Sequence, residues 1–138
     1  MIGNKPENGE RLIDGAYVKG VARGQNDGYA SGIVAAAGGG QAAAVVLPSE
    51  ALIEVDTVAT ANDSVALPVS DAGMRAVIVN NTANSMNLYA NPLANQKNGN
   101  ALDTINGQAN ANAYAIGPGV SVMLVCPKAG SWFALKSA

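Results

Sequence analysis

The chain has 138 residues, of which 13% are charged, and its formal net charge is −2. This length suits one domain rather than two, and the acidic balance lacks the basic footprint that binding to nucleic-acid phosphates requires. The lysines and arginines are scattered, and no apolar stretch approaches the roughly 20 residues of a membrane-spanning helix. We therefore expect neither nucleic-acid binding nor membrane association.

The N-terminal segment, residues 1–28, is rich in glycine, asparagine and charge and shows neither helical nor alternating periodicity. We interpret it as an extended arm, and since its start lacks the apolar core of a secretory signal, we do not expect secretion by that route. Tyr17, Val18 and Val21 belong to a run within it that can form a strand if a partner supplies the neighbouring edge. These three are candidate interface residues, together with Tyr29 just after the arm.

The segment from Tyr29 to Leu47 combines glycine and alanine with β-branched residues and is interrupted by three consecutive glycines. Two short strands around a glycine loop are the favoured interpretation. A short helix through the alanines of 35–37 and 42–44 competes with it, because alanine has the highest helix propensity. Each intervening glycine opposes that helix by about 1 kcal/mol.

The clearest strand signals begin at Ala51, in β-prone runs that mix polar and apolar residues and end at proline, glycine or asparagine. The expected strands are 52–59, 64–67, 74–79, 86–90, 102–105, 113–116, 120–126 and 132–136. Several short strands at such spacing indicate an all-β fold. We expect residues 29–138 to form a small antiparallel β-sandwich or barrel, jelly-roll-like in form.

An internal similarity sharpens this expectation. Met74–Met86 can be laid without a gap over Val120–Trp132, and each copy contains a strand, a turn of about four residues and a returning strand. The identical positions are Val79 and Val125, Ala83 and Ala129, and Ser85 and Ser131. Two related hairpins would pack as facing halves of a sandwich, although chance similarity between β-hairpins of like composition is the alternative.

The residues needed for common chemistry are scarce. The chain has no histidine, which removes the commonest general base and metal ligand. Glu54 and Asp56 share a strand face that we interpret as solvated, because no third ligand accompanies them. Cys126 is the only cysteine, which excludes an intrachain disulfide, and at the end of an apolar run it is expected in the core. We expect no enzymatic activity, no cofactor and no metal.

Only 4% of the residues are aromatic, so the side chains available for a core are small and burial against neighbours is expected to complete the fold. Trp132 and Phe133 are consecutive and should therefore point to opposite faces of a strand. One should enter the core while the other meets solvent or a neighbour. Both are candidate interface residues, since aromatic anchors are common at subunit interfaces.

Five segments of the C-terminal half resemble small virion proteins of tailed bacteriophages, in particular the capsid decoration, or cement, proteins. The segments are Ser64–Pro68, Val77–Asn80, Asp103–Gly107, Val120–Cys126 and Gly130–Ala134. The resemblance implies a virion structural protein that binds the outer surface of an assembled capsid and bridges adjacent capsomers. Its partners would be the major capsid protein and itself, often as a homotrimer, after assembly in the cytoplasm of the bacterial host.

Related β-modules of phage particles have similar strand and turn patterns. A β-domain of a head fibre, spike or tail-associated protein involved in attachment is therefore the alternative. A carbohydrate-active enzyme or a lectin-like binder is disfavoured, because it would need carboxylate pairs or exposed aromatic residues that the sequence hardly offers.

Overall fold

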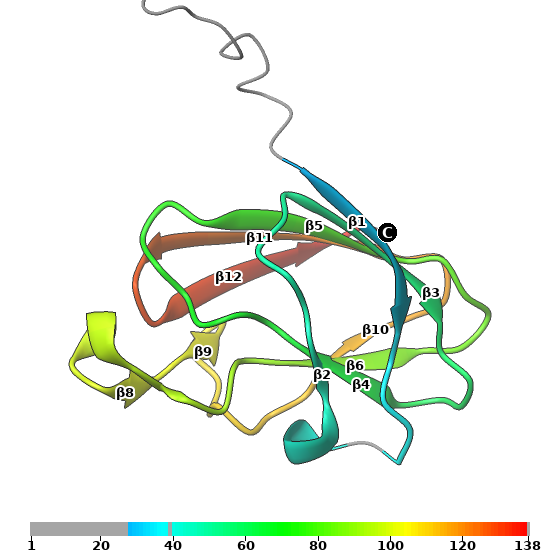
Figure 1. Cartoon of the computed structure of the whole chain (residues 1–138), viewed down its shortest axis with the longest axis horizontal. Coiled ribbons are helices and arrows are strands. Elements are labelled where there is room, and N and C mark those ends of the chain that lie inside the picture. Colours follow the sequence, from blue (N-terminus) through cyan, green and yellow to red (C-terminus); the bar gives the residue numbers. More distant parts are fainter. Residues whose placement is uncertain (1–27, 39, 138) are drawn as a thin grey trace, which may run out of the picture.

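The computed structural model describes residues 28–38 and 40–137 and is built mainly of short strands (Figure 1). The expected arm, apart from Gly28, lies outside these residues, and so do its candidate interface residues Tyr17, Val18 and Val21. The strands are β1 Tyr29–Val34, β2 Val45–Val46, β3 Leu52–Thr57, β4 Asp63–Ala66, β5 Arg75–Asn80, β6 Met86–Tyr89, β7 Ala94–Asn95, β8 Ala101–Leu102, β9 Thr104–Ile105, β10 Tyr114–Ile116, β11 Ser121–Lys128 and β12 Ser131–Lys136. Two 3-10 helices cover Gln41–Ala43 and Gln96–Asn98.

The first six strands run alternately through two sheets. β1, β3 and β5 pair in parallel in one sheet, and β2, β4 and β6 pair in parallel in the other, with Leu52 beside Val77 and Val65 beside Leu88. The coils are thus formed by β1 with β2, β3 with β4, and β5 with β6, and these three coils stack on each other. The fold is a β-solenoid with stacked parallel coils, and the expected antiparallel sandwich or barrel is wrong.

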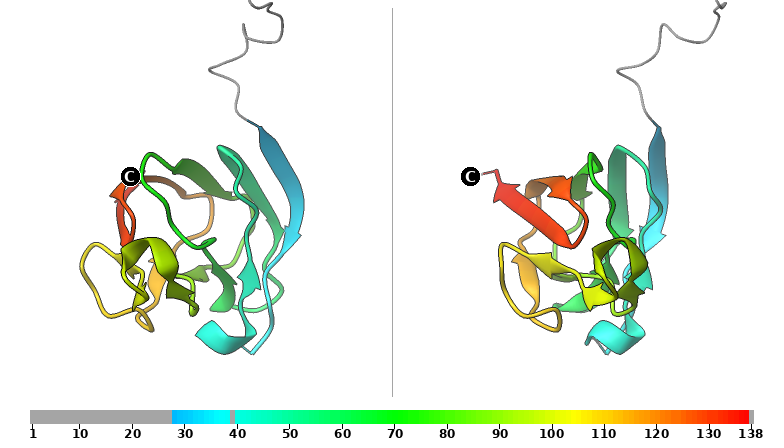
Figure 2. Two further views of the ribbon diagram at one scale, coloured as in Figure 1. Left: turned by 60° about the vertical axis from the view of Figure 1, so that its left-hand side comes forward. Right: turned by 90° about the vertical axis from the view of Figure 1, so that its left-hand side faces the viewer.

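The strands that follow the third coil continue the two sheets in another way. β11 pairs antiparallel with β5 and with β12, while β10 pairs antiparallel with β6. The complete orders are β1-β3-β5-β11-β12-β9 and β10-β6-β4-β2, with β7 and β8 as a separate small hairpin. Figures 1 and 2 show the two larger sheets as opposite walls of the molecule.

The two segments aligned in the sequence differ in connectivity. β11 and β12 form the expected hairpin, with Gly130 at φ 94° in its turn. The expected hairpin of 74–86 is wrong, because β5 and β6 lie in different sheets. The buried Asn80 stabilises the connection from β5 to β6, which we call the β5–β6 corner. Its Nδ2 donates to the carbonyl oxygens of Asn84 (2.8 Å), Ile116 (3.1 Å) and Gly117 (3.0 Å).

The core fills the space between the sheets, with alternate residues of strands such as β5 and β11 and all four residues of β4 buried. Ile53, Ile78, Leu88, Leu124 and Trp132 are among its fully buried side chains. Burial of this kind contributes about 1.5–3 kcal/mol for each large apolar side chain. The core therefore draws on both the coils and the antiparallel end.

Cys126 is 1% exposed, which confirms its expected place in the core. Its Sγ lies 3.0 Å from the carbonyl oxygen of Lys128. Desolvation raises the pKa of this thiol above its ordinary value, so it stays neutral near pH 7.

A buried polar cluster joins the β4–β5 connection to β7, to Asp103 just before β9 and to the β11–β12 turn. The Ser70 backbone N–H donates to Asp103 Oδ2 (2.8 Å), Asn95 Nδ2 donates to Asp103 Oδ1 (2.7 Å), and the Gly130 N–H donates to Ser70 Oγ (2.7 Å). All four residues are buried and mutually satisfied, as buried polar groups generally are. The cluster fixes the course of residues 67–74.

Most strand positions expected from the sequence agree with the structure, including two short strands around the glycine loop of 29–47. The expected single strand 102–105 is wrong, because Asp103 separates β8 from β9 and the two belong to different sheets, and β7 was not expected. The competing alanine helix is reduced to the single 3-10 turn Gln41–Ala43. Most positions of the strands were therefore predictable, whereas their pairing was not.

Candidate functional site

A row of apolar side chains crosses the solvent-facing side of the six-stranded sheet. It passes through Tyr29, Leu52, Val77, Met123 and Leu135, each of which is the cross-strand partner of the next. Leu135 is 71% exposed, Tyr29 56%, Met123 53% and Leu52 40%. Side chains paired in this way are close neighbours on one face of a sheet, so the row is continuous over five strands.

A second, shorter row lies beside it on the same face. Val125 is paired with Phe133, and both are 40% or more exposed. We call the side chains of the two rows, Tyr29, Leu52, Val77, Met123, Val125, Phe133 and Leu135, the outer apolar face. Isolated exposed apolar residues are ordinary, whereas a contiguous set marks an interaction surface.

The outer apolar face exists because its strands have apolar residues at both odd and even positions, so that both sides of the sheet are apolar there. In β11, Val122 and Leu124 point into the core, whereas Met123 and Val125 point outward. A strand of an antiparallel pair with one solvated face normally alternates apolar and polar residues. A near-continuous apolar run is typical of strands covered on both faces.

Charged groups border the outer apolar face on two sides. Glu54 lies two residues beyond Leu52 on β3, and its carboxylate accepts hydrogen bonds from Tyr29 Oη (2.7 Å) and Asn81 Nδ2 (2.7 Å). Arg75 lies two residues before Val77 on β5 and is paired with Val125. The hydrogen bond to Glu54 raises the pKa of Tyr29 above its ordinary value.

Glu54 and Asp56 share this outer face, as expected for a solvated strand face, and their partners are structural. Glu54 binds Tyr29 and Asn81, and Asp56 accepts a hydrogen bond from the Gly32 backbone N–H. These hydrogen bonds join β1, β3 and the corner after β5. They stabilise the stacking of the coils.

The candidate interface residues from the sequence lie in different environments. Tyr29 and Phe133 both lie on the outer apolar face, at β1 and β12 respectively, with exposed side chains. Trp132 is 1% exposed and points into the core, so the consecutive aromatic residues do face opposite sides. The other members of the outer apolar face were missed, although the continuous apolar run of 122–126 was a usable signal; they are Leu52, Val77, Met123, Val125 and Leu135.

The edges of the two large sheets add a second feature. β1 and β2 are the terminal strands of their sheets within residues 28–38 and 40–137. The sequence of β1, Tyr-Ala-Ser-Gly-Ile-Val, contains neither a charge nor a proline. Such residues are the usual protection of an edge strand against pairing with another chain.

Among the described residues, no group of three or more cysteine, aspartate or glutamate side chains is placed to hold a metal ion. No helix in that part of the chain is long and apolar enough to span a bilayer. Comparisons with known protein families, with curated proteins and with solved structures find no match to this chain.

Proposed function

We propose that this chain is a non-catalytic structural protein that assembles with other protein chains through its outer apolar face. The observation that carries the proposal is the continuous apolar row from Tyr29 to Leu135 across five strands. Removal of such a surface from water favours association by roughly 25 cal/mol for each Å² of apolar area. Flanking charges from Glu54 and Arg75 supply the polar rim that is usual around an interface core.

The form of assembly that we favour is capsid decoration, in which the protein binds the outer surface of an assembled capsid and bridges capsomers. This choice is supported by the resemblance of the C-terminal half to cement proteins and by the breadth of the outer apolar face. A broad surface suits many weak contacts repeated over a shell. The proposed partners are the major capsid protein and further copies of the chain, as a homotrimer.

The contribution of the outer apolar face is tested with a charge placed at its centre. Met123→Glu introduces a carboxylate that must be desolvated in any interface formed there, so we expect self-association and particle binding to fall at least tenfold. Leu93→Glu is the matched control, because Leu93 is 64% exposed and lies outside the six-stranded sheet. Sedimentation of the purified variants and their co-pelleting with phage particles measure the two effects. Equal behaviour of the two variants would contradict the proposal.

The target surface is identified by imaging purified phage particles at side-chain resolution and locating the chain on them. Density on the outer shell, with the outer apolar face against the major capsid protein or a second copy, agrees with capsid decoration. Density on a tail or fibre replaces it with the alternative. A purified particle without the chain contradicts both.

The alternative, a β-domain of a head fibre, spike or tail-associated protein, is favoured by one observation. Within residues 28–38 and 40–137, β1 and β2 are terminal in their sheets and form an edge of stacked parallel coils on which strands of another chain can continue. Stacking of that kind builds elongated assemblies, because each coil contacts only its neighbours.

A further inference from the structure

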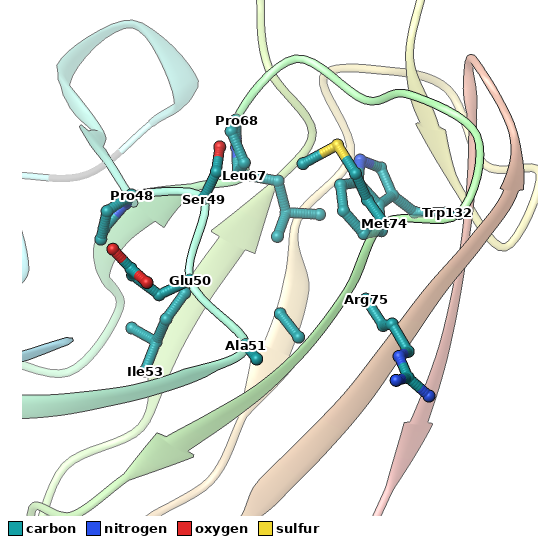
Figure 3. A pocket seen from close by; sticks show the side chains of 12 residues that line it. Pro48, Ser49, Glu50, Ala51, Ile53, Leu67, Pro68, Met74, Arg75 and Trp132 are labelled. Atoms are coloured by element: carbon teal, nitrogen blue, oxygen red, sulfur yellow. The ribbon is translucent and has the colours of Figure 1, made fainter. Parts of the chain in front are cut away.

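The methionines of the described residues lie in three different environments. Met86 is 0% exposed and belongs to the core. Met74 is partly buried, and its sulfur accepts a hydrogen bond from the Asp71 backbone N–H (3.1 Å). Figure 3 shows Met74 in the wall of a cavity of about 280 Å³, which it lines together with Trp132. Met123, on the outer apolar face, is 53% exposed, so its side chain is the one of the three that is most open to a reagent in solution.

Met123 lies at the centre of the outer apolar face. Its strand, β11, is the fourth of six in its sheet, and its direct cross-strand partners are Val77 on β5 and Leu135 on β12. Val125, two residues further along β11, belongs to the second apolar row of the same face. Apolar side chains therefore surround Met123 on three sides. A polar group introduced at this position lies in the middle of the surface that is removed from water when a partner binds.

The thioether of an accessible methionine reacts with hydroperoxides without any catalytic group of the protein. A lone pair of the sulfur attacks the terminal oxygen of the hydroperoxide, the O–O bond breaks and an S–O bond forms. The sulfur loses two electrons and the peroxide gains them. The proton of the attacked oxygen passes to the departing oxygen, which leaves as water or an alcohol. The product, methionine sulfoxide, is polar, and methionine sulfoxide reductases convert it back to the apolar thioether.

Access and consequence both distinguish Met123 from the other two methionines. The core excludes an oxidant from Met86, and the hydrogen bond from the Asp71 N–H engages a lone pair of the Met74 sulfur. A sulfoxide at Met74 would also lie outside the outer apolar face. At Met123 the neighbouring Val77 and Leu135 offer no hydrogen-bond donor to the new oxygen, so an interface formed there would bury it unsatisfied.

We propose that Met123 is a modification site for hydroperoxides, and that its oxidation state controls whether the outer apolar face binds a partner. The thioether form assembles, and the sulfoxide form does not. The inference rests on the proposed function, since it takes the outer apolar face as the interface. Oxidation acts on the unassembled chain, because a partner that covers Met123 keeps the oxidant from its sulfur. Chains oxidised before assembly are thereby kept out of the assembled particle until a reductase repairs them.

The modification site is tested first, without reference to assembly. The full chain is treated with dilute hydrogen peroxide, and peptide mass spectrometry follows the added oxygen at each methionine over time. We expect Met123 to be oxidised roughly tenfold faster than Met74, and faster still than Met86. Circular dichroism of the treated chain checks that the fold is retained. Oxidation of Met74 or Met86 as fast as that of Met123 would overturn the assignment of the site.

The effect on assembly is measured by sedimentation and by co-pelleting with phage particles, with each chain compared before and after peroxide. Oxidation of the parent chain should weaken both associations about tenfold or more, and treatment with methionine sulfoxide reductases and a dithiol should restore them. Met74→Leu keeps the sulfur of Met123 and should respond to peroxide as the parent chain does. Met123→Leu has no sulfur on the outer apolar face, so peroxide should no longer change its association.

The outcomes separate this inference from the proposed function. An equal response of Met123→Leu to peroxide, or no recovery of the parent chain after repair, would overturn the control by Met123. Unchanged association of the oxidised parent chain, where Met123→Glu has lost it, would overturn that control and leave the proposed function standing. Unchanged association of both the oxidised chain and Met123→Glu would overturn the two together.

Discussion

The strands of the stacked coils, β1–β6, and those of the antiparallel end, β10–β12, form the same two sheets, yet they are connected differently. In the coils each strand is followed by one in the opposite sheet, whereas β11 is followed by its own neighbour β12. In both regions the hydrophobic pattern records only which side chains face the core, and not which strand lies beside which. The segment between two strands determines whether the chain turns back within the same sheet or crosses to the opposite sheet.

Two equivalent positions in the aligned segments Met74–Met86 and Val120–Trp132 show what determines the connection. Asn80 ends β5, and Cys126 occupies the same place in the second segment, and both are buried. The Asn80 amide binds three carbonyl oxygens outside its own strand, and its Oδ1 accepts a hydrogen bond from Thr82 Oγ1 (2.7 Å). Cys126 offers only a weak donor, and β11 continues past it to Lys128 and turns at Gly130. A polar corner therefore redirects the chain to the other sheet.

The strongest way to probe this comparison is to ask whether the two regions share one core. Trp132→Ala removes a fully buried side chain of the antiparallel end from the space between both sheets, so we expect a loss of about 3–5 kcal/mol in the free energy of unfolding. Phe133→Ala is the matched control on the exposed face and should cost about 0.5 kcal/mol. Urea unfolding followed by circular dichroism measures both.

Hydrogen exchange in the Trp132→Ala variant sharpens the result. One shared core predicts that amides of β3 and β11 lose protection together, since both strands contribute to it. Loss of protection confined to β11 and β12 would show that the coils are stable by themselves, and would break the picture of a single cooperative unit.

The second prediction concerns the corner that separates the two modes of connection. Asn80→Ala leaves the carbonyl oxygens of Asn84, Ile116 and Gly117 without their amide donor, and we expect a loss of about 2 kcal/mol in the free energy of unfolding. The neighbouring Asn81 is exposed and its side-chain amide donates to Glu54 alone among the described residues, so Asn81→Ala should cost about 0.5 kcal/mol. Thermal or chemical unfolding of the two variants side by side tests this. Equal losses would show that the corner does not depend on the buried amide.

The sequence was sufficient for the positions of most strands and insufficient for their partners. The run beginning at Leu52 and the run beginning at Met86 both became strands near the expected bounds. Their sheet was not predictable, because an asparagine-rich stretch such as 80–84 favours a turn whether the chain returns or crosses. The hydrogen bonds of Asn80 to Ile116 and Gly117 connect residues far apart in sequence and have no local signature.

The candidate site was predictable in part for the same reason. Consecutive aromatic residues guaranteed that one of Trp132 and Phe133 would face outward, but only the packing of the core showed which one. The alignment of Tyr29 with Leu52, Met123 and Leu135 depends on the register of five strands, and a shift by one residue would have reversed every face. The outer apolar face is thus a property of the sheet rather than of any segment.

The smallest predicted effect distinguishes the two regions by their tyrosines. Tyr29 in the coils has a raised pKa mainly because its hydroxyl donates to Glu54, whereas burial raises the pKa of Tyr114 in the antiparallel end. Glu54→Gln should therefore bring the pKa of Tyr29 back toward its ordinary value near 10 and leave that of Tyr114 unchanged. Ring resonances of the two tyrosines, followed from pH 8 to pH 12, measure both values.

The direction of the associated change in stability follows from the sign of the shift. The pKa of Tyr29 is higher in the folded chain than in the unfolded chain. The protonated hydroxyl therefore contributes fully to the free energy of unfolding below about pH 10, and this contribution is lost as the pH rises through the pKa of the folded chain. The loss should be slight, since the side chain is exposed and salt screens the pair. The unfolding midpoint of the Glu54→Gln chain should therefore fall less steeply with rising alkaline pH than that of the parent chain. An equally steep fall would show that the hydrogen bond across β1 and β3 contributes nothing to the stacking of the coils.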